Sequence, residues 1–512
     1  MQQESRVKKS LLNARVNLIF YFLSLALSFF SRKIFLDCLG ADFVGLSGTL
    51  GNILGFLSLA EMGVGIAVSY HLYKPIQEGN KEQINELVSV FGYLYHKIGL
   101  FIGLGAVLIS MFIPLIFRDT TFNLGLIFFA FYSILASSLF GYFINYRQIL
   151  LSADQKGYVV TIYLQGAGYV KVLLQMVVAY YWQNYYLWIL LDVILGVISC
   201  IVLNWKIRAT YPWLEATATF GKKVFPKHKN IVTYTKQIFV HKIKDFLLTQ
   251  SDQILVFAFV SLKMVAYYGN YTLITSKLTQ LFGSFMGSIW ASVGNLVAEG
   301  DKEKTLKVFW EIQSVFFLIA GIVVFSVYHF IDSFICLWLG EEYLLEETVL
   351  VLLLINVFIM LIRSAVDMFN NAYGHYADTW SAWAEGITNV IVTLALAPSM
   401  GIAGILLGKI VSLILFVILW KPYYLYHSGF NLSIKKYWYN IIKYWCILVV
   451  CFYIGHVIYM KIPLESSISF TCWIVKAIIT ILPFASIYFI GLYIFANGMK
   501  DITNRFLFKL KA

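Results

Sequence analysis

Long apolar stretches recur along almost the whole chain, and only short polar connections separate them. Segments such as Gly99–Phe117, Leu187–Leu203 and Val349–Ile362 are nearly free of charged residues. A helix that crosses a bilayer needs roughly 20 mostly apolar residues, so the pattern predicts about fourteen membrane-spanning helices. Their expected ranges are 13–36, 43–71, 88–117, 121–149, 157–182, 185–206, 237–261, 264–296, 306–331, 348–371, 379–397, 400–426, 438–460 and 470–497. No gap holds a folded soluble domain, so we expect an all-α, polytopic membrane protein.

Composition supports this class. Hydrophobic residues make up 60% of the chain, charged residues 13%, and the mean hydropathy is +0.76. Soluble domains average about 25% charged residues. The net charge of +12 lies mostly in the predicted loops, so it indicates topology rather than a nucleic-acid partner. The six cysteines show no CxxC spacing and the histidines no HExxH pattern, so we expect no metal site and no cofactor.

The basic residues are unevenly divided between the two sides of the membrane. When successive loops are assigned to alternate sides, one side receives only Arg32, Lys33, Arg118, Lys263 and Lys461, and the other receives most of the remaining lysines and arginines. The positive-inside rule therefore places both termini in the cytoplasm. The basic start followed by the apolar run Leu18–Phe30 is interpreted as an uncleaved first helix.

The chain contains signs of an internal repeat. Similar short turns recur at an offset of roughly 221–224 residues, as expected for two copies of six spans each. The matched turns are Phe43–Gly45 with Tyr267–Gly269, Leu115–Asp119 with Leu337–Glu341, and Ser152–Lys156 with Tyr373–Ala377. Because six spans separate the copies, both have the same orientation. We therefore expect an N-lobe at 1–206, a basic cytoplasmic linker at 207–236, a C-lobe at 237–427, and a C-terminal helix pair with a basic tail at 428–512.

Polar side chains follow single faces of several predicted spans. The stripes are Lys242, Asp245, Thr249 and Asp252 on span seven, Arg363, Asp367 and Asn370 or Asn371 on span ten, and Asp378, Ser381, Glu385 and Thr388 on span eleven. Single charges at membrane depth are Glu61, Arg147, Lys171, Asp192, Lys277 and Lys409. Charge inside a membrane is costly, so it usually faces a wet cavity or a partner.

Structural explanations compete with functional ones for these residues. Arg15, Arg147 and Lys242 lie near predicted cytoplasmic ends, where they can extend to lipid headgroups. Arg363 and Asp367 are four residues apart and can neutralise each other. Glu61 and Glu385 are open to three interpretations: protonated buried acids, ion sites, or partners of the lysines.

The balance of these charges favours an anionic polar cargo, because phosphate pairs with Lys and Arg. The candidate cargo-binding residues are Arg15, Lys171, Lys242, Lys277, Arg363 and Lys409, and the candidate ion-coupling residues are Glu61, Asp245, Asp252, Asp367 and Glu385. A drug/cation antiporter would be expected to have an acidic cavity. A membrane glycan polymerase commonly has a large outward loop, whereas every predicted outward loop here is short. No Walker A pattern is present, and no catalytic residue is predicted, so we do not expect an enzyme.

The segment Ile34–Leu46, with its Leu39-Gly40 and Phe43-Val-Gly45 turn, is followed by Leu57–Gly65 with its spaced acid and glycines. These motifs resemble the opening of polysaccharide-biosynthesis flippases, the O-antigen or Wzx-type members of the multidrug/oligosaccharidyl-lipid/polysaccharide exporter superfamily. The resemblance implies two lobes with alternating access. It also implies transfer of an undecaprenyl-pyrophosphate-linked oligosaccharide from the cytoplasmic to the periplasmic leaflet of the bacterial inner membrane. We accordingly expect a monomer that contacts membrane lipids and acts beside a glycan polymerase and a chain-length regulator.

Overall fold

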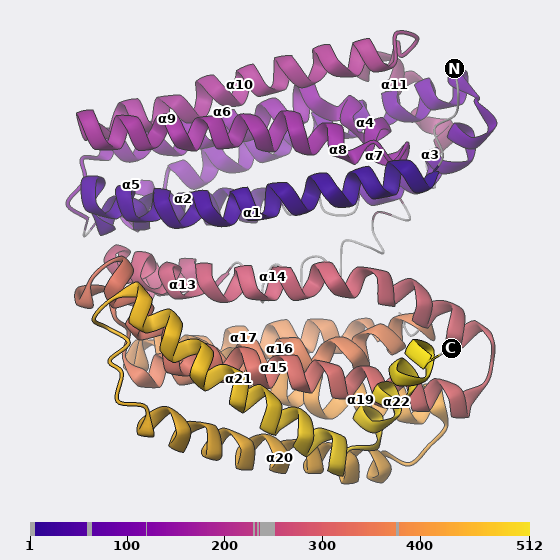
Figure 1. The fold of residues 1–512 in the computed structure, drawn as a ribbon. Helices are drawn as coiled ribbons and strands as arrows, with labels where there is room; N and C mark the ends of the chain where they lie inside the picture. The colour runs from indigo at the N-terminus through magenta and orange to yellow at the C-terminus, as the bar shows by residue number, and fades with distance from the viewer. Residues whose placement is uncertain are drawn as a thin grey trace. The chain divides into compact units, whose positions relative to one another are not determined.

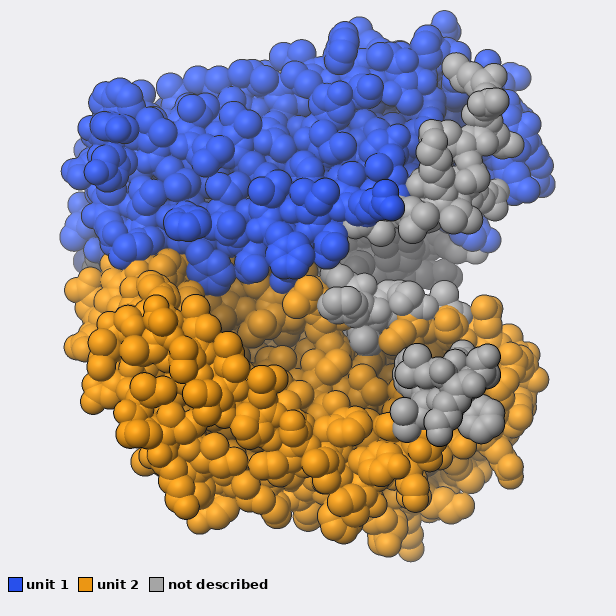
Figure 2. Space-filling view, in the orientation of Figure 1, with its two compact units in different colours: residues 1–266 blue, residues 267–512 orange. Residues whose placement is uncertain are grey.

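The computed structural model describes residues 6–58, 64–118, 120–228, 231–232, 235, 251–374 and 378–511. The chain forms two compact units, Met1–Ala266 and Tyr267–Ala512, which Figure 2 shows in different colours. Within the described ranges all regular structure is helical (Figure 1).

Unit 1 is a bundle of antiparallel helices that are mostly joined by short turns. Its elements are α1 (Arg6–Leu39), α2 (Ala41–Leu57), α3 (Val64–Glu78), α4 (Lys81–Ser110), α5 (Ile113–Ile116), α6 (Leu124–Ile144), η2 (Asn145–Arg147), α7 (Gln148–Ala153), α8 (Gly157–Val160), the π-helical turn η3 (Thr161–Gln165), α9 (Gly166–Trp182), α10 (Tyr185–Thr210), α11 (Ala218–Val224), η4 (Phe225–His228) and α13 (Ser251–Phe259). Asparagine side chains cap α4, α6 and α10 by accepting backbone N–H bonds. Gly40, at φ +85°, makes the sharp turn between α1 and α2.

Unit 2 begins within α14 (Leu262–Ala298), whose first residues belong to unit 1. Its further elements are α15 (Lys302–Trp338), η5 (Glu341–Tyr343), α16 (Glu347–Ala372), α17 (Thr379–Met400), α18 (Ile402–Ser412), the π-helix η6 (Leu413–Trp420), α19 (Lys421–Tyr424), the π-helix η7 (Leu425–Phe430), α20 (Ile434–Lys461), α21 (Phe470–Phe495) and α22 (Asn497–Lys511). The C-terminal helices α20 and α21 lie side by side, and α21 packs on α15 (Figure 1).

Each unit has its own apolar core and an apolar outer surface. Unit 2 is rich in buried aromatic rings, such as Phe325 stacked on Phe484 with ring centroids 3.8 Å apart. Large apolar side chains such as Leu173 on α9, Ile201 on α10 and Val450 on α20 remain exposed. Ten stretches of the described helices are long and apolar enough to cross a membrane. Exposed apolar surface on such helices is the surface that lipid covers.

The prediction of an all-α, polytopic membrane protein is confirmed. The predicted span at 43–71 corresponds to two helices, α2 and α3, and the span at 400–426 contains the π-helix η6 and the first two residues of η7. Of the predicted span at 237–261, the described part is α13 and the two residues that follow it, and it packs on α2 within unit 1. The predicted lobe boundaries stay predictions.

The first part of the predicted linker is bound to unit 1. The carbonyl oxygen of Ala216 accepts hydrogen bonds from Arg147 Nε at 3.2 Å, Arg147 Nη2 at 2.8 Å and Tyr146 Oη at 3.1 Å. A Cβ on Gly221 of α11 would lie 1.9 Å from the carbonyl oxygen of Ser89 on α4, so only glycine permits this approach. Burial and the neighbouring Asp154 carboxylate raise the pKa of Tyr211, which keeps its hydroxyl a neutral donor to Asp154. Arg147 therefore fastens the linker to η2 rather than reaching a headgroup.

Candidate functional site: buried charge clusters in each unit

A polar stripe on α17 is buried against the glycine face of α18. Its residues Ser381, Glu385, Asn389 and Thr393 have at most 3% of their surface exposed. They recur every four residues, so they share one face of the helix. A Cβ on Gly408 of α18 would lie 2.2 Å from Thr393 Oγ1. Small residues thus let the two backbones approach closely, as is common in membrane helix pairs.

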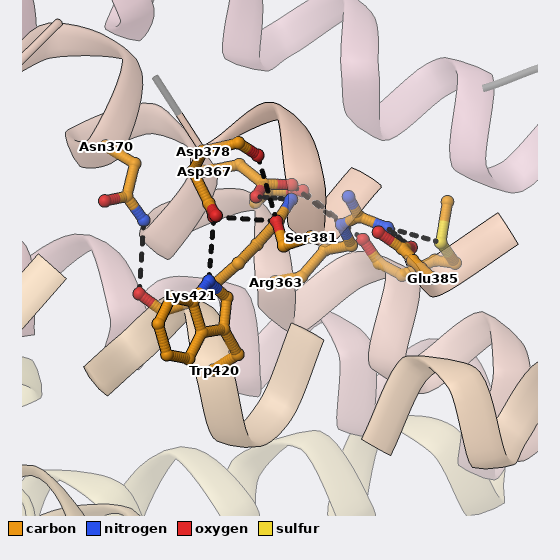
Figure 3. A network of polar contacts seen from close by, with 10 residues as sticks. Arg363, Asp367, Asn370, Asp378, Ser381, Glu385, Trp420 and Lys421 are labelled. Atoms are coloured by element: carbon orange, nitrogen blue, oxygen red, sulfur yellow. Dashed lines mark hydrogen bonds and ion pairs between the residues drawn. The ribbon is translucent and has the colours of Figure 1, made fainter. Parts of the chain in front are cut away.

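Beside this stripe, Asp367 of α16 is held between two cations (Figure 3). Arg363 Nε lies 2.7 Å from its Oδ2, and Lys421 Nζ of α19 lies 2.7 Å from its Oδ1. Asn370, one turn further along α16, donates to the carbonyl oxygen of Lys421 at 3.3 Å. The cluster therefore joins α16 to the helix that follows the π-helix η6.

Glu385 is fully buried and depends on Arg363. Arg363 Nη1 lies 3.6 Å from Glu385 Oε1, and this is the one ion pair that the described residues give this carboxylate. Neither carboxylate oxygen accepts a hydrogen bond there. Ser412 Oγ donates to the backbone carbonyl oxygen of Glu385 and so supplies no hydrogen bond to the carboxylate. A buried carboxylate in this setting is unfavourable unless a partner of opposite charge stabilises it.

A third carboxylate, Asp378, completes the unit 2 cluster at the start of α17. Its Oδ2 accepts from Ser381 Oγ at 2.7 Å and from Trp420 Nε1 at 2.9 Å. Figure 3 thus shows two cations, Arg363 and Lys421, among three carboxylates. The cluster is of mixed charge and is not a cationic patch.

Unit 1 contains a smaller cluster near the middle of its membrane-spanning helices. Lys171 of α9 forms an ion pair and hydrogen bond with Asp192 of α10, with 30% and 20% of the two side chains exposed. Lys171 also lines a cavity of about 240 Å³ whose polar walls include Asn145, Ser137 and Ser199. Fourteen residues separate Lys171 from Gly157 and eleven from Trp182, so it lies roughly 16–21 Å from each end of the helix.

The two clusters occupy matching positions in the predicted repeat. Asn145 lies at the end of span four, and Asp367 lies at the corresponding point of span ten, roughly 222 residues later. The same offset relates Lys171 to Thr393. Each predicted half therefore has a polar centre among its fourth, fifth and sixth spans.

The structure brings some of the predicted site residues together and separates others. Arg363, Asp367 and Glu385 meet in unit 2, whereas Lys171 is paired with Asp192. Arg15 lies exposed on α1, Lys277 and Lys409 are half-buried on α14 and α18, and Asp252 is buried at the start of α13. Glu61, Lys242 and Asp245 lie outside the described residues.

Lys421 and Trp420 are members of the cluster that sequence reasoning does not find. Lys421 lies near the end of the expected span 400–426, and the charge pattern counts it only among the basic residues of the cytoplasmic side. The π-helical turns of η6 rotate Trp420 and Lys421 to a different face of the helix from the one that an α-helix would give them. The hydrophobic periodicity of the sequence does not reveal this rotation.

Comparisons with known proteins agree with this architecture. No family model matches the sequence, and no curated protein matches it. Among solved structures the fold is similar to that of the lipid II flippase MurJ in an inward closed conformation, with a TM-score of 0.66 and 15% identity over 93% of this chain and 99% of that chain. It is also similar to an inward-facing multidrug resistance MATE family transporter of the MOP superfamily, with a TM-score of 0.59 and 14% identity over 78% of this chain and 92% of that chain.

A third similar structure is a point mutant of the Vibrio cholerae MATE transporter VcmN, with a TM-score of 0.50 and 15% identity over 83% of this chain and 99% of that chain. The chain thus has the fold seen in the structures of this flippase and of these two MATE transporters.

Proposed function

We propose that this protein is a flippase that moves an undecaprenyl-pyrophosphate-linked oligosaccharide from the cytoplasmic to the periplasmic leaflet of the bacterial inner membrane. The single observation that carries the proposal is the likeness to a lipid II flippase along nearly the whole chain. The fold alone supports a transporter, and the choice of a lipid-linked glycan rests on the arguments below.

The C-terminal helix pair favours a lipid flippase over a drug transporter. The similarity to the lipid II flippase leaves 7% of the 512 residues unmatched, or about 36 residues. Helices α20 and α21 have 28 and 26 residues, so at least part of this pair belongs to the matched fold. The multidrug transporter leaves 22% unmatched, which is enough to omit both helices.

We further propose that cargo binding competes with the ion pairs in the two units. A pyrophosphate group accepts charge-assisted hydrogen bonds from Lys and Arg, so it can replace Asp192 at Lys171 or a carboxylate at Arg363. A carboxylate that loses its cation at membrane depth takes up a proton or a metal cation. In this proposal the residues that bind the pyrophosphate are Arg15, Lys171, Lys242, Lys277, Arg363 and Lys409. The residues that take up the coupling cation are Glu61, Asp245, Asp252, Asp367 and Glu385.

The remaining features of the proposal concern arrangement and partners. The N-lobe at 1–206 and the C-lobe at 237–427 would rock about the cargo, with both termini in the cytoplasm. A glycan polymerase and a chain-length regulator would use the product, and the protein would act as a monomer.

A drug/cation antiporter is the second candidate. Its supporting observation is the net acidic balance of the unit 2 cluster, in which three carboxylates face two cations. An acidic site favours a cationic cargo, and two of the similar structures are MATE transporters.

The test is the distribution of lipid-linked oligosaccharide between leaflets in cells that lack the protein. We expect repeat units to accumulate on the cytoplasmic face and the intact gene to restore them to the periplasmic face. Repeat units that reach the periplasm but fail to lengthen would indicate a polymerase, and altered drug tolerance with unchanged glycan would indicate the antiporter.

A second experiment tests the role of the cations. Neutralising Lys171, Lys277 and Lys409 together should reduce export per molecule of folded protein, because each change removes a phosphate-binding charge. Unchanged export in this variant would refute the proposed cargo contacts.

A further inference from the structure

Three basic side chains meet near one end of the C-terminal helix pair. His329 of α15 and His456 of α20 share a hydrogen bond, with Nε2 and Nδ1 3.1 Å apart. Lys476 of α21 places its Nζ 4.0 Å from the centre of the Tyr459 ring. The Tyr459 ring in turn lies 4.7 Å from the His329 ring, so the three basic groups form one cluster around Tyr459.

The surrounding bonds fix the protons of the two histidines. His329 Nδ1 lies 3.0 Å from the carbonyl oxygen of Phe325, which only accepts, so Nδ1 is the donor. In a neutral ring His329 Nε2 is then the acceptor, and His456 Nδ1 donates to it. The Nε2 atom of His456 is left with a lone pair, which becomes a donor when His456 takes up a proton.

The charge of this cluster is not balanced by an anion from the part of the chain that the structure describes. Among those residues, no carboxylate lies within ion-pair distance of Lys476, His329 or His456. Asp332, one turn beyond His329, accepts a hydrogen bond from Tyr271 instead, and Glu465 in the α20–α21 connection is exposed. The groups that face His329 from the neighbouring helices, His456 and Lys476, are both basic.

The cluster is too buried for water to solvate it fully. Lys476 is 8% exposed and His329 is 7% exposed, whereas His456 is half-buried. One turn along α21 from Lys476, Thr480 is fully buried and its hydroxyl has no hydrogen-bond partner in the described structure. A lysine that is this buried lacks part of its hydration and has no counter-ion among the described residues, so an anion that reaches its ammonium group stabilises it.

The cluster lies just inside the membrane, near the headgroup region at one end of α21. Helix α21 has 26 residues and is about 39 Å long, against roughly 30 Å of hydrocarbon, so each end reaches the headgroup region. Lys476 is six residues and about 9 Å from Phe470, so its backbone lies roughly 4–5 Å inside the hydrocarbon. A lysine side chain can extend from that depth toward the headgroup phosphates. The exposed side chains of Tyr453, Ile478 and Leu482 place lipid-facing surface on the same two helices.

We propose that Lys476 and His456 bind the phosphate group of a membrane lipid, which supplies the missing negative charge. The leaflet is the one at the α20–α21 connection, the outer leaflet in the predicted topology. The ammonium of Lys476 and the Nε2–H of protonated His456 donate to phosphate oxygens, and His329 orients His456 by accepting from its Nδ1. The site takes either an anionic phospholipid or an isoprenyl diphosphate, and it does not depend on the proposed flippase activity.

The test measures lipid binding to the purified full-length protein by native mass spectrometry. The probes are phosphatidylglycerol, undecaprenyl diphosphate and a neutral diacylglycerol. We expect Lys476→Gln to weaken binding of a phosphate lipid about tenfold, or about 1.4 kcal/mol, while diacylglycerol binding stays unchanged. His456→Gln should also weaken binding of a phosphate lipid, because it removes the second donor to the phosphate oxygens.

The matched control is Lys461→Gln, because Lys461 is an exposed lysine at the same end of α20. A preference for undecaprenyl diphosphate would identify the cargo carrier as the ligand, and a preference for phosphatidylglycerol would identify a resident phospholipid. Lys476→Arg keeps the charge and should retain binding if Lys476→Gln fails to fold. Equal binding in the Lys476→Gln and Lys461→Gln proteins, or unchanged binding in the His456→Gln protein, would overturn the proposal.

Discussion

Removing Arg363 should destabilise the protein more than removing Glu385, its ion-pair partner. Arg363→Met leaves Glu385 fully buried without its cation, whereas Asp367 keeps Lys421 at 2.7 Å. Breaking a buried pair from one side is unfavourable by about 3–5 kcal/mol. Because this pair is 3.6 Å apart and the carboxylate accepts no hydrogen bond within the described residues, we expect the lower end, about 3 kcal/mol. Glu385→Met should be milder, since Arg363 keeps its bond to Asp367.

The double variant Arg363→Met/Glu385→Met removes the orphaned carboxylate. It should therefore recover most of the loss, which gives a coupling energy of about 2 kcal/mol, within the range for residues in direct contact. The assay is unfolding by SDS in mixed micelles, followed by tryptophan fluorescence, for the wild type, both single variants and the double variant.

An exposed pair serves as the control for this cycle. Lys304 and Glu299 lie 2.6 Å apart with 54% of each side chain exposed, and solvent screening should limit their coupling to about 0.5 kcal/mol. If the losses at Arg363 and Glu385 simply add, or if both single variants are equally destabilised, the assignment of Glu385 to Arg363 is wrong.

Three further predictions concern packing, the linker and the unit 1 pair. Gly408→Ala should destabilise the protein by about 1–3 kcal/mol, because the new methyl group meets Thr393. Gly51→Ala, which has open space around it, should be neutral or stabilising in the same unfolding assay. Arg147→Met should increase trypsin cleavage at Lys222 and Lys223 about tenfold or more, since two hydrogen bonds to the Ala216 carbonyl are lost; an unchanged digestion rate would show that α11 holds the linker alone. Lys171→Asp and Asp192→Lys should each lower the yield of folded protein, because each places two like charges side by side. The double variant Lys171→Asp/Asp192→Lys should restore most of that yield. A double variant as unstable as the single variants would contradict a simple ion pair.

Sequence periodicity locates the helices well, because apolar length is a strong constraint in membranes. It also finds the Arg363–Asp367 pair, which depends only on a four-residue spacing along one helix. It does not find the partner of Lys171, because Asp192 lies on the next helix and the pairing depends on how α9 and α10 are rotated. Lys421 is missed for a related reason: its position depends on a π-helical segment that apolar composition does not reveal.

The same limitation applies to the role of Arg147. From the sequence it is a cation near a cytoplasmic helix end, and extension to headgroups is a reasonable expectation. The structure directs it to a single carbonyl of the linker, Ala216, sixty-nine residues away in the chain. Long-range backbone acceptors of this kind have no signature in side-chain patterns.

The π-helix η6 has an evolutionary consequence. A π-helical turn corresponds to one residue inserted into an α-helix, and such segments recur at functional sites. Deletion of one residue between Leu413 and Trp420 would let the segment relax into an α-helix and would rotate everything after it by roughly 100°. Lys421 would then turn away from Asp367, and Trp420 away from Asp378. The contacts of Lys421 and Trp420 therefore depend on the length of this segment, and we expect relatives of this chain to tolerate substitutions there far better than insertions or deletions.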